Sequence, residues 1–209
     1  MKNLFTIFPS NQKGLAQRSN LALESISKFA GGRGSLLLVP SEEVEAWERL
    51  AEDGKVKVHG LSNTTKGALI TVALGIDQVP KDSEILIAPT NAMINTNLQS
   101  FVNELRENNS DAGVIAFPSS NPNYSYLRTY QNEIIEVSEK IVSGTLATAG
   151  VFYFRNSELL ISSIRWAIVN NVNYDGNFFI APSLNYFVMN NLRIRSYLIE
   201  QNEYIRNEI

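Results

Sequence analysis

The sequence predicts an α/β protein with a mostly parallel sheet flanked by helices and a mixed β extension. In the first 117 residues, five short runs are almost continuously apolar, as expected for strands that are buried on both faces. Segments with apolar residues at helical spacing separate these runs. Strands that alternate with helices form parallel sheets, in which each helix returns the chain to the start of the next strand. After these residues, polar turns and alternating patterns predict additional antiparallel strands.

The predicted strands of the first half are the runs LFTIF, SLLLVP, VKVHGL, ILIAP and AGVIAF. A helix is expected after SLLLVP, because Ser41 can cap it and Glu42 and Glu43 would lie in its first turn, where the helix dipole favours negative charge. Apolar positions at helical spacing predict two more helices, over residues 68–76 and 98–105. The helix that is expected after Ser41 would have an inner face of Val44, Trp47, Leu50 and Ala51.

The second half is predicted to contain a hairpin, a long strand, two helices and a last strand. The hairpin turns at Gln131 and Asn132. The other elements are expected at residues 147–154, 158–169, 182–189 and 194–199. The polar tail IEQNEYIRNEI is either an ordered end or a dimer contact, so a homo-oligomer stays open. We find no repeat or linker, which predicts a single domain over residues 1–209 with halves at 1–117 and 118–209.

Composition argues against several classes of function. Lys and Arg number 18, Asp and Glu number 21, and no basic run is present, so we expect no nucleic-acid binding. The absence of cysteine excludes disulfides, a thiol nucleophile and a thiolate metal site. The apolar run LFTIF is too short for the core of a signal peptide or for a membrane span. These observations predict a cytoplasmic protein without a membrane span.

The stretch ILIAPTNAMI places small polar residues directly after a buried strand. The strand stops at Pro89, and Thr90 and Asn91 follow it. In open α/β sheets, ligands bind at the carboxyl ends of the strands. A phosphate site there usually includes a carboxylate that holds a metal, whereas this turn offers an amide.

A second candidate site lies between the motifs VSEK and ATAGVFYF. Glu139 and Lys140 end one predicted strand, and Gly150 lies inside the next one. A glycine within a strand often marks the close approach of a ligand or of another backbone, and the lysine could contact a phosphate as a point charge. The alternative is a solvated charge pair on a hairpin and a glycine at a β-bulge.

Together these motifs resemble the sugar-phosphate nucleotidyltransferases, and more closely their relatives in capsule and lipopolysaccharide clusters. The family pattern is a Ser-Tyr strand, a polar turn, V-x-E-K, A-T-x-G and G-E-F-Y-x-A-P-x-x-N; the matching segments here are SYLRTYQNEIIEVSEK, ATAGVFYF and YDGNFFIAPSLNYFV. Upstream, TTKGAL resembles the family's T-x-G-A helix start, and ILIAPTNAMI resembles its L-I-A-N-S-D-Q strand end. The resemblance covers residues 55–199. It implies a Rossmann-like nucleotidyltransferase fold of the GT-A type, with a nucleotide-type first half and an acceptor-type second half.

The resemblance also implies a reaction, in which a sugar phosphate attacks the α-phosphorus of a nucleoside triphosphate and pyrophosphate leaves. By position in the matching motifs, Thr65 and Gly67 would lie beside the base, at a helix N-terminus that offers backbone donors. Thr90 and Asn91 would lie at the turn that contacts metal and ribose.

On the acceptor side, the resemblance implies three further residues. Glu139 and Lys140 would contact the sugar and phosphate of the acceptor, and Gly150 would leave space for the sugar. The partner expected from this match is therefore a nucleotide or a sugar phosphate.

The sequence departs from the family in the loop that grips the triphosphate. The family has G-x-G-x-R followed by a lysine, whereas the first strand here leads into PSNQKGLAQRSN. Only Lys13, Gly14 and Arg18 could imitate that loop, and the segment is short. The sequence GGRGS precedes the second strand, at the end of the sheet opposite to a phosphate site, so we interpret it as a helix stop and turn.

The family's acidic residues are also replaced. Asn91 stands at the position of the metal-binding aspartate, and an amide can ligate a hard cation but adds no charge. We therefore predict no resident metal, and Mg²⁺ only as carried by the nucleotide. Asn177 replaces the glutamate of G-E-F-Y; Asp175 is either its substitute or a residue that caps a turn.

His59 is the sole histidine, and we expect a packed or surface role for it rather than a catalytic one. Three functions remain. The first is a divergent nucleotidyl- or glycosyl-transferase of surface-polysaccharide assembly that binds a nucleotide, nucleotide-sugar or sugar phosphate. The second is a non-catalytic relative that acts in binding or as a partner subunit, and the third is a structural accessory with an empty cleft. The missing loop and aspartate favour the second function over a standard enzyme, and Glu139, Lys140 and Gly150 favour the first.

Overall fold

The computed structural model describes residues 3–10, 14, 20–30, 34–50 and 56–206. Within these ranges, one large sheet has the strand order β10-β6-β9-β4-β1-β2-β3, and β7 and β8 extend it as a hairpin beside β9. The sheet strands are β1 (Leu4–Pro9), β2 (Ser35–Pro40), β3 (Val56–Leu61), β4 (Glu84–Ile87), β6 (Ala112–Pro118), β7 (Ser125–Tyr130), β8 (Glu133–Glu139), β9 (Leu146–Phe154) and β10 (Ile194–Leu198). A separate two-stranded sheet pairs β5 (Ala92–Ile94) with β11 (Tyr204–Arg206).

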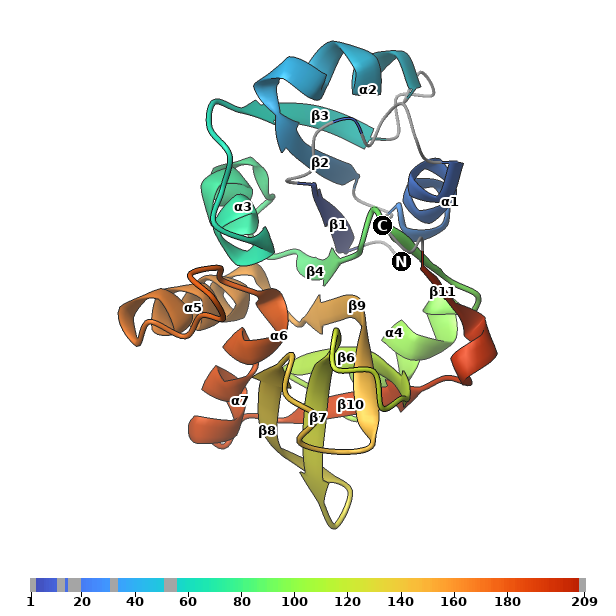
Figure 1. Ribbon diagram of the computed structural model, residues 1–209, viewed down its shortest axis with the longest axis vertical. Helices are drawn as coiled ribbons and strands as arrows, with labels where there is room; N and C mark the ends of the chain where they lie inside the picture. The colour runs from blue at the N-terminus through green and yellow to red at the C-terminus, as the bar shows by residue number, and fades with distance from the viewer. Residues whose placement is uncertain (1–2, 11–13, 15–19, 31–33, 51–55, 207–209) are drawn as a thin grey trace.

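Helices cover both faces of the large sheet (Figure 1). They are α1 (Asn20–Phe29), α2 (Val44–Leu50), α3 (Ala68–Gly75), α4 (Leu98–Glu107), α5 (Ser157–Val169), α6 (Ile180–Ser183) and α7 (Asn185–Met189). The 3₁₀ turns in the described part of the chain are η1 (Ser41–Glu43), η2 (Ile76–Gln78) and η3 (Gln201–Glu203). This architecture confirms the predicted α/β class with a mostly parallel sheet and a mixed β extension.

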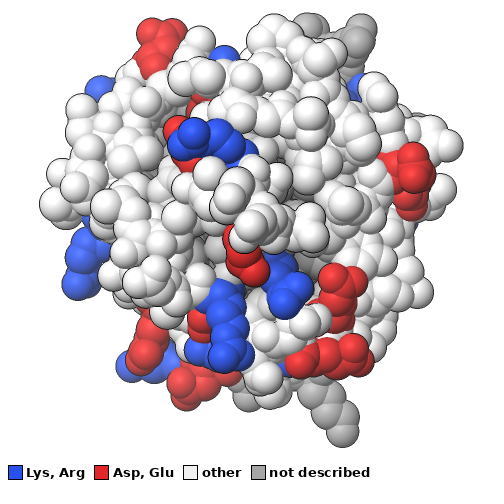
Figure 2. All heavy atoms as spheres, turned by 90° about the horizontal axis from the view of Figure 1, so that it is seen from below, with Lys and Arg blue, Asp and Glu red and all other residues white. Residues whose placement is uncertain are grey.

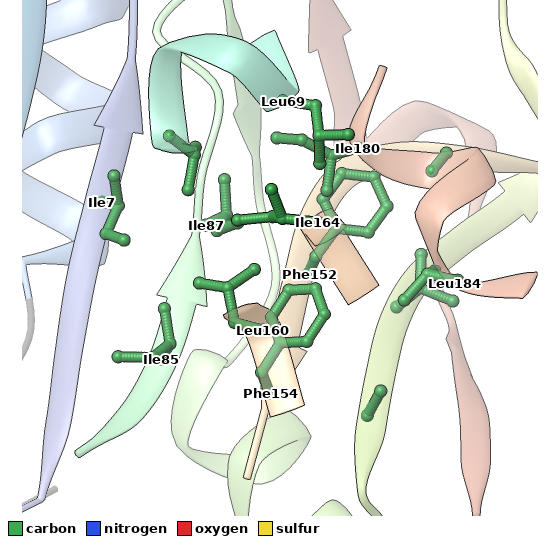
Figure 3. Close-up of a cluster of buried hydrophobic side chains, with 14 of the residues drawn as sticks. Ile7, Leu69, Ile85, Ile87, Phe152, Phe154, Leu160, Ile164, Ile180 and Leu184 are labelled. Carbon is green, nitrogen blue, oxygen red and sulfur yellow. The ribbon is translucent and has the colours of Figure 1, made fainter. Parts of the chain in front are cut away.

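Two hydrophobic cores lie on the two faces of the sheet. On one face, α3, α5, α6 and α7 pack against β1, β4 and β9. Figure 3 shows Phe152 and Phe154 of β9 among side chains from α3, α5 and α6. On the other face, α1, α2 and α4 bury residues such as Phe29, Trp47 and Phe101. Successive strand residues alternate between the two cores, which explains why the strands read as continuous apolar runs.

The parallel strands are interrupted by one antiparallel member in the middle of the sheet. β9 pairs antiparallel with β4 on one side and with β6 on the other. Its pairing with β6 shifts register between Val114 and Ala116, and Gly150 lies opposite this irregularity with φ of +78°. The structure therefore contains the β-bulge that was one interpretation of Gly150.

Three local predictions need correction. Ser41 does not cap α2 but begins the turn η1, whose N-cap is Pro40 without a side-chain hydrogen bond. The helix predicted over 182–189 is two short helices that meet at Leu184. On α2, Trp47 is buried, whereas Leu50 is 41% exposed because the helix lies over the edge of the sheet.

The charged side chains are mixed in sign on the face shown in Figure 2, where wide uncharged areas separate small groups of both signs. That face carries no continuous basic band of the kind that tracks a nucleic-acid backbone. In the described part of the chain, no helix has the length and apolar character needed to cross a membrane.

Candidate ligand pocket at the carboxyl end of the sheet

A pocket with a volume of about 290 Å³ lies where β1 and β4 end. β1 neighbours β2 on one side and β4 on the other, so the chain's path across the sheet changes direction here. This topological switch point is where open α/β sheets bind ligands. The β8 end and the bulge of β9 complete the pocket, whose volume is near the lower limit of about 300 Å³ for small-molecule sites.

The turn after β4 forms one wall of the pocket. Ala88 donates its backbone N–H to Ile7 at 3.0 Å, which continues the pairing of β4 with β1. The buried hydroxyl of Ser25 on α1 donates to the carbonyl of Pro89 at 2.6 Å. Thr90 is buried and Asn91 is partly exposed, and both line the pocket. The turn is thus held from two sides, which fixes Asn91 at the pocket wall.

Glu139, the last residue of β8, lines the opposite wall. It is only 8% exposed, and the hydroxyl of Ser125 donates a hydrogen bond to its carboxylate. Burial raises the pKa of Glu139, although the hydrogen bond from Ser125 and the charges of Lys140 and Arg206 oppose that rise. A buried carboxylate with a perturbed pKa in a pocket is typical of a functional site.

Lys140 follows Glu139 in a left-handed backbone conformation, with φ of +52°. Its backbone N–H donates to the carbonyl of Tyr124 at 3.0 Å, so the turn is anchored to the neighbouring strand region. The Nζ atom lies 5.3 Å from the centre of the Tyr174 ring and 5.5 Å from that of Phe179. The two rings hold the exposed ammonium group at the pocket.

Gly150 lines the same pocket. A Cβ atom at this position would lie 3.6 Å from the ring carbons of Pro89, which is an ordinary contact, but φ of +78° disfavours any side chain. The structure thus brings together Thr90, Asn91, Glu139, Lys140 and Gly150, as the motif match implied. Their roles toward a ligand remain predictions.

Thr65 and Gly67 lie beside this pocket rather than in its wall. The Thr65 hydroxyl is 2.6 Å from that of Thr71, and Thr65 lines a small hollow that shares Ser10 with the main pocket. Gly67 precedes α3 with φ of +93°, and a Cβ there would lie 2.3 Å from the carbonyl oxygen of Phe178. Leu69 donates its N–H to that same carbonyl at 3.1 Å. The loop before α6 thus occupies a backbone donor that the motif match assigned to a ligand.

Asp175 and Asn177 lie in that loop and are not among the residues that line the pocket. Tyr174 and Asn177 exchange backbone hydrogen bonds of 2.9 and 3.0 Å around a two-residue turn. Asp175 and Gly176 form the turn with φ of +49° and +72°. Positive φ at both central residues is the pattern of a type I′ turn, for which Asp-Gly is favoured. The sequence Asp-Gly is accounted for by this turn, and the catalytic role of Asp175 stays a prediction.

Of the remaining candidates, those that the structure describes do not line the pocket. Lys13 and Arg18 lie outside the described residues. Gly14 is described, and its N–H donates to the Glu43 carboxylate at 2.7 Å. Gly34, at the end of GGRGS, precedes β2 and so lies at the opposite end of the sheet from the pocket. His59 lies on β3, the edge strand of the sheet.

Among the residues of the pocket that sequence reasoning missed are Ser10, Tyr204 and Arg206. Ser10 follows β1, and its buried hydroxyl has no hydrogen-bond partner within the described ranges. Tyr204 and Arg206 belong to β11, which pairs with β5 directly after Asn91. Nothing in the sequence of the polar tail indicated a pocket, because a strand of three residues is too short to show an alternating hydrophobic pattern.

The donor set of the pocket does not fit a divalent cation. Hard cations need several oxygen ligands and favour carboxylates. Of the described residues that line the pocket, Glu139 is the sole carboxylate, while Lys140 and Arg206 are both cationic. No group of three or more His, Cys, Asp or Glu with the arrangement of a metal site occurs within the described ranges.

Comparison with known structures shows the fold. A nucleoside-diphosphate-sugar pyrophosphorylase from Vibrio cholerae RC9 matches with a TM-score of 0.78 and 19% identity, over 96% of this chain and 94% of that one. A Bacillus anthracis protein provisionally assigned as a glucose-1-phosphate thymidylyltransferase, in complex with sucrose, matches with a TM-score of 0.73 and 12% identity. The match covers 94% of this chain and 87% of that one. The inositol-1-phosphate CTP transferase from T. maritima matches with a TM-score of 0.69 and 12% identity, over 95% of this chain and 86% of that one. No protein-family model matches the sequence, and no curated protein resembles it closely in sequence. The chain therefore has a nucleotidyltransferase-like fold.

Proposed function

We propose that this protein binds a sugar phosphate, a nucleotide or a nucleotide-sugar in the pocket between β4 and β8. The observation that carries the proposal is the convergence of Glu139 and Lys140 with the turn at Asn91. A carboxylate accepts hydrogen bonds from sugar hydroxyls, and an ammonium group neutralises phosphate charge. The nucleotidyltransferase-like fold is compatible with such a ligand.

We propose a transferase of the nucleotidyl- or glycosyl-transfer class as the first candidate activity. Transfer to a phosphorus atom requires positioning and neutralisation of charge on phosphate oxygens. Lys140 and Arg206 both line the pocket and supply positive charge to it. By the motif match, we place this activity in the cytoplasmic assembly of a surface polysaccharide.

The second candidate is a non-catalytic relative that binds the same ligands or a partner subunit. The amide of Asn91 favours this alternative, because the pocket offers one carboxylate where metal-dependent chemistry needs more. The two candidates share the ligand and differ in turnover.

A thermal-shift screen of the full chain tests the shared part. The panel contains nucleotides, nucleotide-sugars, sugar phosphates and the corresponding neutral sugars, with and without magnesium or manganese. We expect a phosphorylated member to raise the melting temperature, because a ligand that binds only the native state stabilises it by mass action. If no member of the panel raises it, the proposed function is wrong. A pyrophosphate-release assay with the bound member then separates enzyme from non-catalytic relative.

A further inference from the structure

The C-terminal strand β11 brings a second cation to the pocket. β11 pairs antiparallel with β5, and Arg206 is the register partner of Ala92, the residue after Asn91. Asn95 donates its N–H to the carbonyl of Glu203 at 2.7 Å, which fixes the start of the strand. Arg206 therefore lies beside the turn at Asn91, where it lines the pocket.

A cluster of aromatic rings holds this strand in place. The rings of Phe117 and Tyr204 stack with their centres 4.5 Å apart, and Tyr124 packs edge-on against both of them, at 5.4 and 5.7 Å. The guanidinium carbon of Arg206 lies 5.7 Å from the centre of the Tyr124 ring. Such packing limits the conformations of the arginine side chain, so the side chain loses less conformational entropy when it binds a ligand.

The positive charge of Arg206 is not neutralised by an ion pair within the described ranges, and the same is true of Lys140. The two cations end different elements, β11 and β8, and both line one pocket. Glu139 is buried in the same pocket, and the charges of both cations lower the pKa of its carboxyl group against the effect of burial. The pocket lining thus carries one more positive than negative charge.

An uncommitted polar group completes the arrangement. The hydroxyl of Ser10 lies at the end of β1, is 3% exposed and has no hydrogen-bond partner in the described part of the chain. An unpaired buried hydroxyl is costly unless a ligand or water pairs with it. Because Ser10 also lines the pocket, a polar group of a bound ligand could pair with this hydroxyl.

We infer that Arg206 and Lys140 together bind the phosphate of the ligand in place of a divalent cation. The inference rests on the proposed function. It adds that the ligand group bound is an anionic phosphate and that these two side chains bind it. A guanidinium binds two phosphate oxygens at once in a planar fork, and an ammonium adds a second positive charge as a point charge. A free divalent cation would be repelled by the same two groups. Binding of a phosphorylated sugar should therefore be independent of magnesium.

The experiment is a calorimetric titration of the full chain with glucose 1-phosphate and with UMP, each in EDTA and in magnesium. Glucose serves as the neutral comparison. We expect equal affinity in both conditions, and a loss of about tenfold or more in Arg206→Gln, the scale of one hydrogen bond to a charged group. Arg206→Lys should restore part of the affinity, because it keeps the charge but loses the fork. Arg128→Gln is the matched control, since Arg128 pairs with Glu136 on the exposed β7–β8 hairpin.

The outcomes separate the inference from the proposed function. If the probes bind only in magnesium, or bind Arg206→Gln as tightly as the native chain, the inference is overturned while the proposed function stands. If neither probe binds in either condition, the inference is overturned, and the thermal-shift panel decides whether the proposed function falls with it. Melting temperatures of all variants must match that of the native chain, which excludes unfolding as the cause of lost affinity.

Discussion

The ammonium group of Lys140 lies 5.3 Å from the centre of the Tyr174 ring, so the β8 turn and the loop before α6 meet at the pocket through a cation and an aromatic face. This contact holds the positive charge at the pocket, and Lys140 forms no ion pair within the described ranges. A ligand phosphate can then use that charge without first breaking a salt bridge.

Lys140→Ala should weaken binding of any phosphorylated ligand by about 1.5–3 kcal/mol, the scale of a hydrogen bond to a charged group. The free energy of unfolding should change by less than about 1 kcal/mol, since only exposed cation–π contacts are lost. Lys140→Met keeps much of the aliphatic stem and tests the charge alone. Calorimetry and urea denaturation on the same preparations measure both quantities. Equal affinity in all three proteins would mean that the match to V-x-E-K carries no binding role here.

Asn91→Asp should not create an efficient nucleotidyltransferase. The introduced carboxylate would lie beside Arg206, which neutralises it, and several groups must act together in phosphoryl transfer. We expect no magnesium binding near micromolar concentrations and weaker binding of phosphorylated ligands, because the new carboxylate pairs with Arg206 and competes with phosphate for its charge. Calorimetry and a pyrophosphate-release assay measure these effects. Asn103→Asp, an exposed position on α4, introduces the same charge away from the pocket. Robust turnover of Asn91→Asp would contradict the prediction.

Gly67→Ala should destabilise the protein by at least about 2 kcal/mol, because backbone strain at positive φ adds to a collision with Phe178. The new Cβ would lie 2.3 Å from the carbonyl oxygen of Phe178. Gly176→Ala is the control, since its φ is +72° but no atom lies within 4 Å of the added carbon. This control should lose only about 1–2 kcal/mol from the left-handed backbone. Urea denaturation measures the stability of both variants. Equal losses of stability would show that the contact between Gly67 and the Phe178 backbone is not tight.

Glu84→Gln should reduce stability at neutral pH by about 1–3 kcal/mol, because the carboxylate binds both Arg106 and Tyr153. Burial raises the pKa of Glu84, but the hydrogen bonds from Arg106 and Tyr153 outweigh it and leave the pKa below the ordinary value of 4.5. A carboxyl group whose pKa is lowered in the folded state contributes its full stabilisation of the fold at pH values above its ordinary pKa. This stabilisation is lost as the pH falls through the pKa of the folded state.

The difference in unfolding free energy between the native chain and Glu84→Gln should therefore shrink below about pH 4.5, the ordinary value for this group. Denaturation by urea at several pH values measures it. Glu45→Gln is the control, because the Glu45–Arg49 pair is exposed and should contribute little at any pH. A difference that grows on acidification would contradict the assignment.

The sheet was predictable because strands buried on both faces must be continuously apolar. The hairpin was predictable as well: Gln131 and Asn132 form its turn, and both have positive φ. The tail was not, because β11 gains its place through aromatic packing of Tyr204 on Phe117, a contact between residues far apart in sequence. Gly67 illustrates a further limit. A glycine indicates that something approaches the backbone closely, but the sequence does not say whether a ligand or, as here, the Phe178 backbone does so.

The position of β9 has a consequence for the order in which the chain folds during synthesis. β4 and β6 are made first, yet β9 lies between them and pairs with both. Until β9 leaves the ribosome, β4 has an open edge, and β6 has no earlier strand of the large sheet to pair with. Open strand edges recruit other chains. The nascent protein is therefore most exposed to association with other nascent chains after β6 has emerged and before Phe154 has.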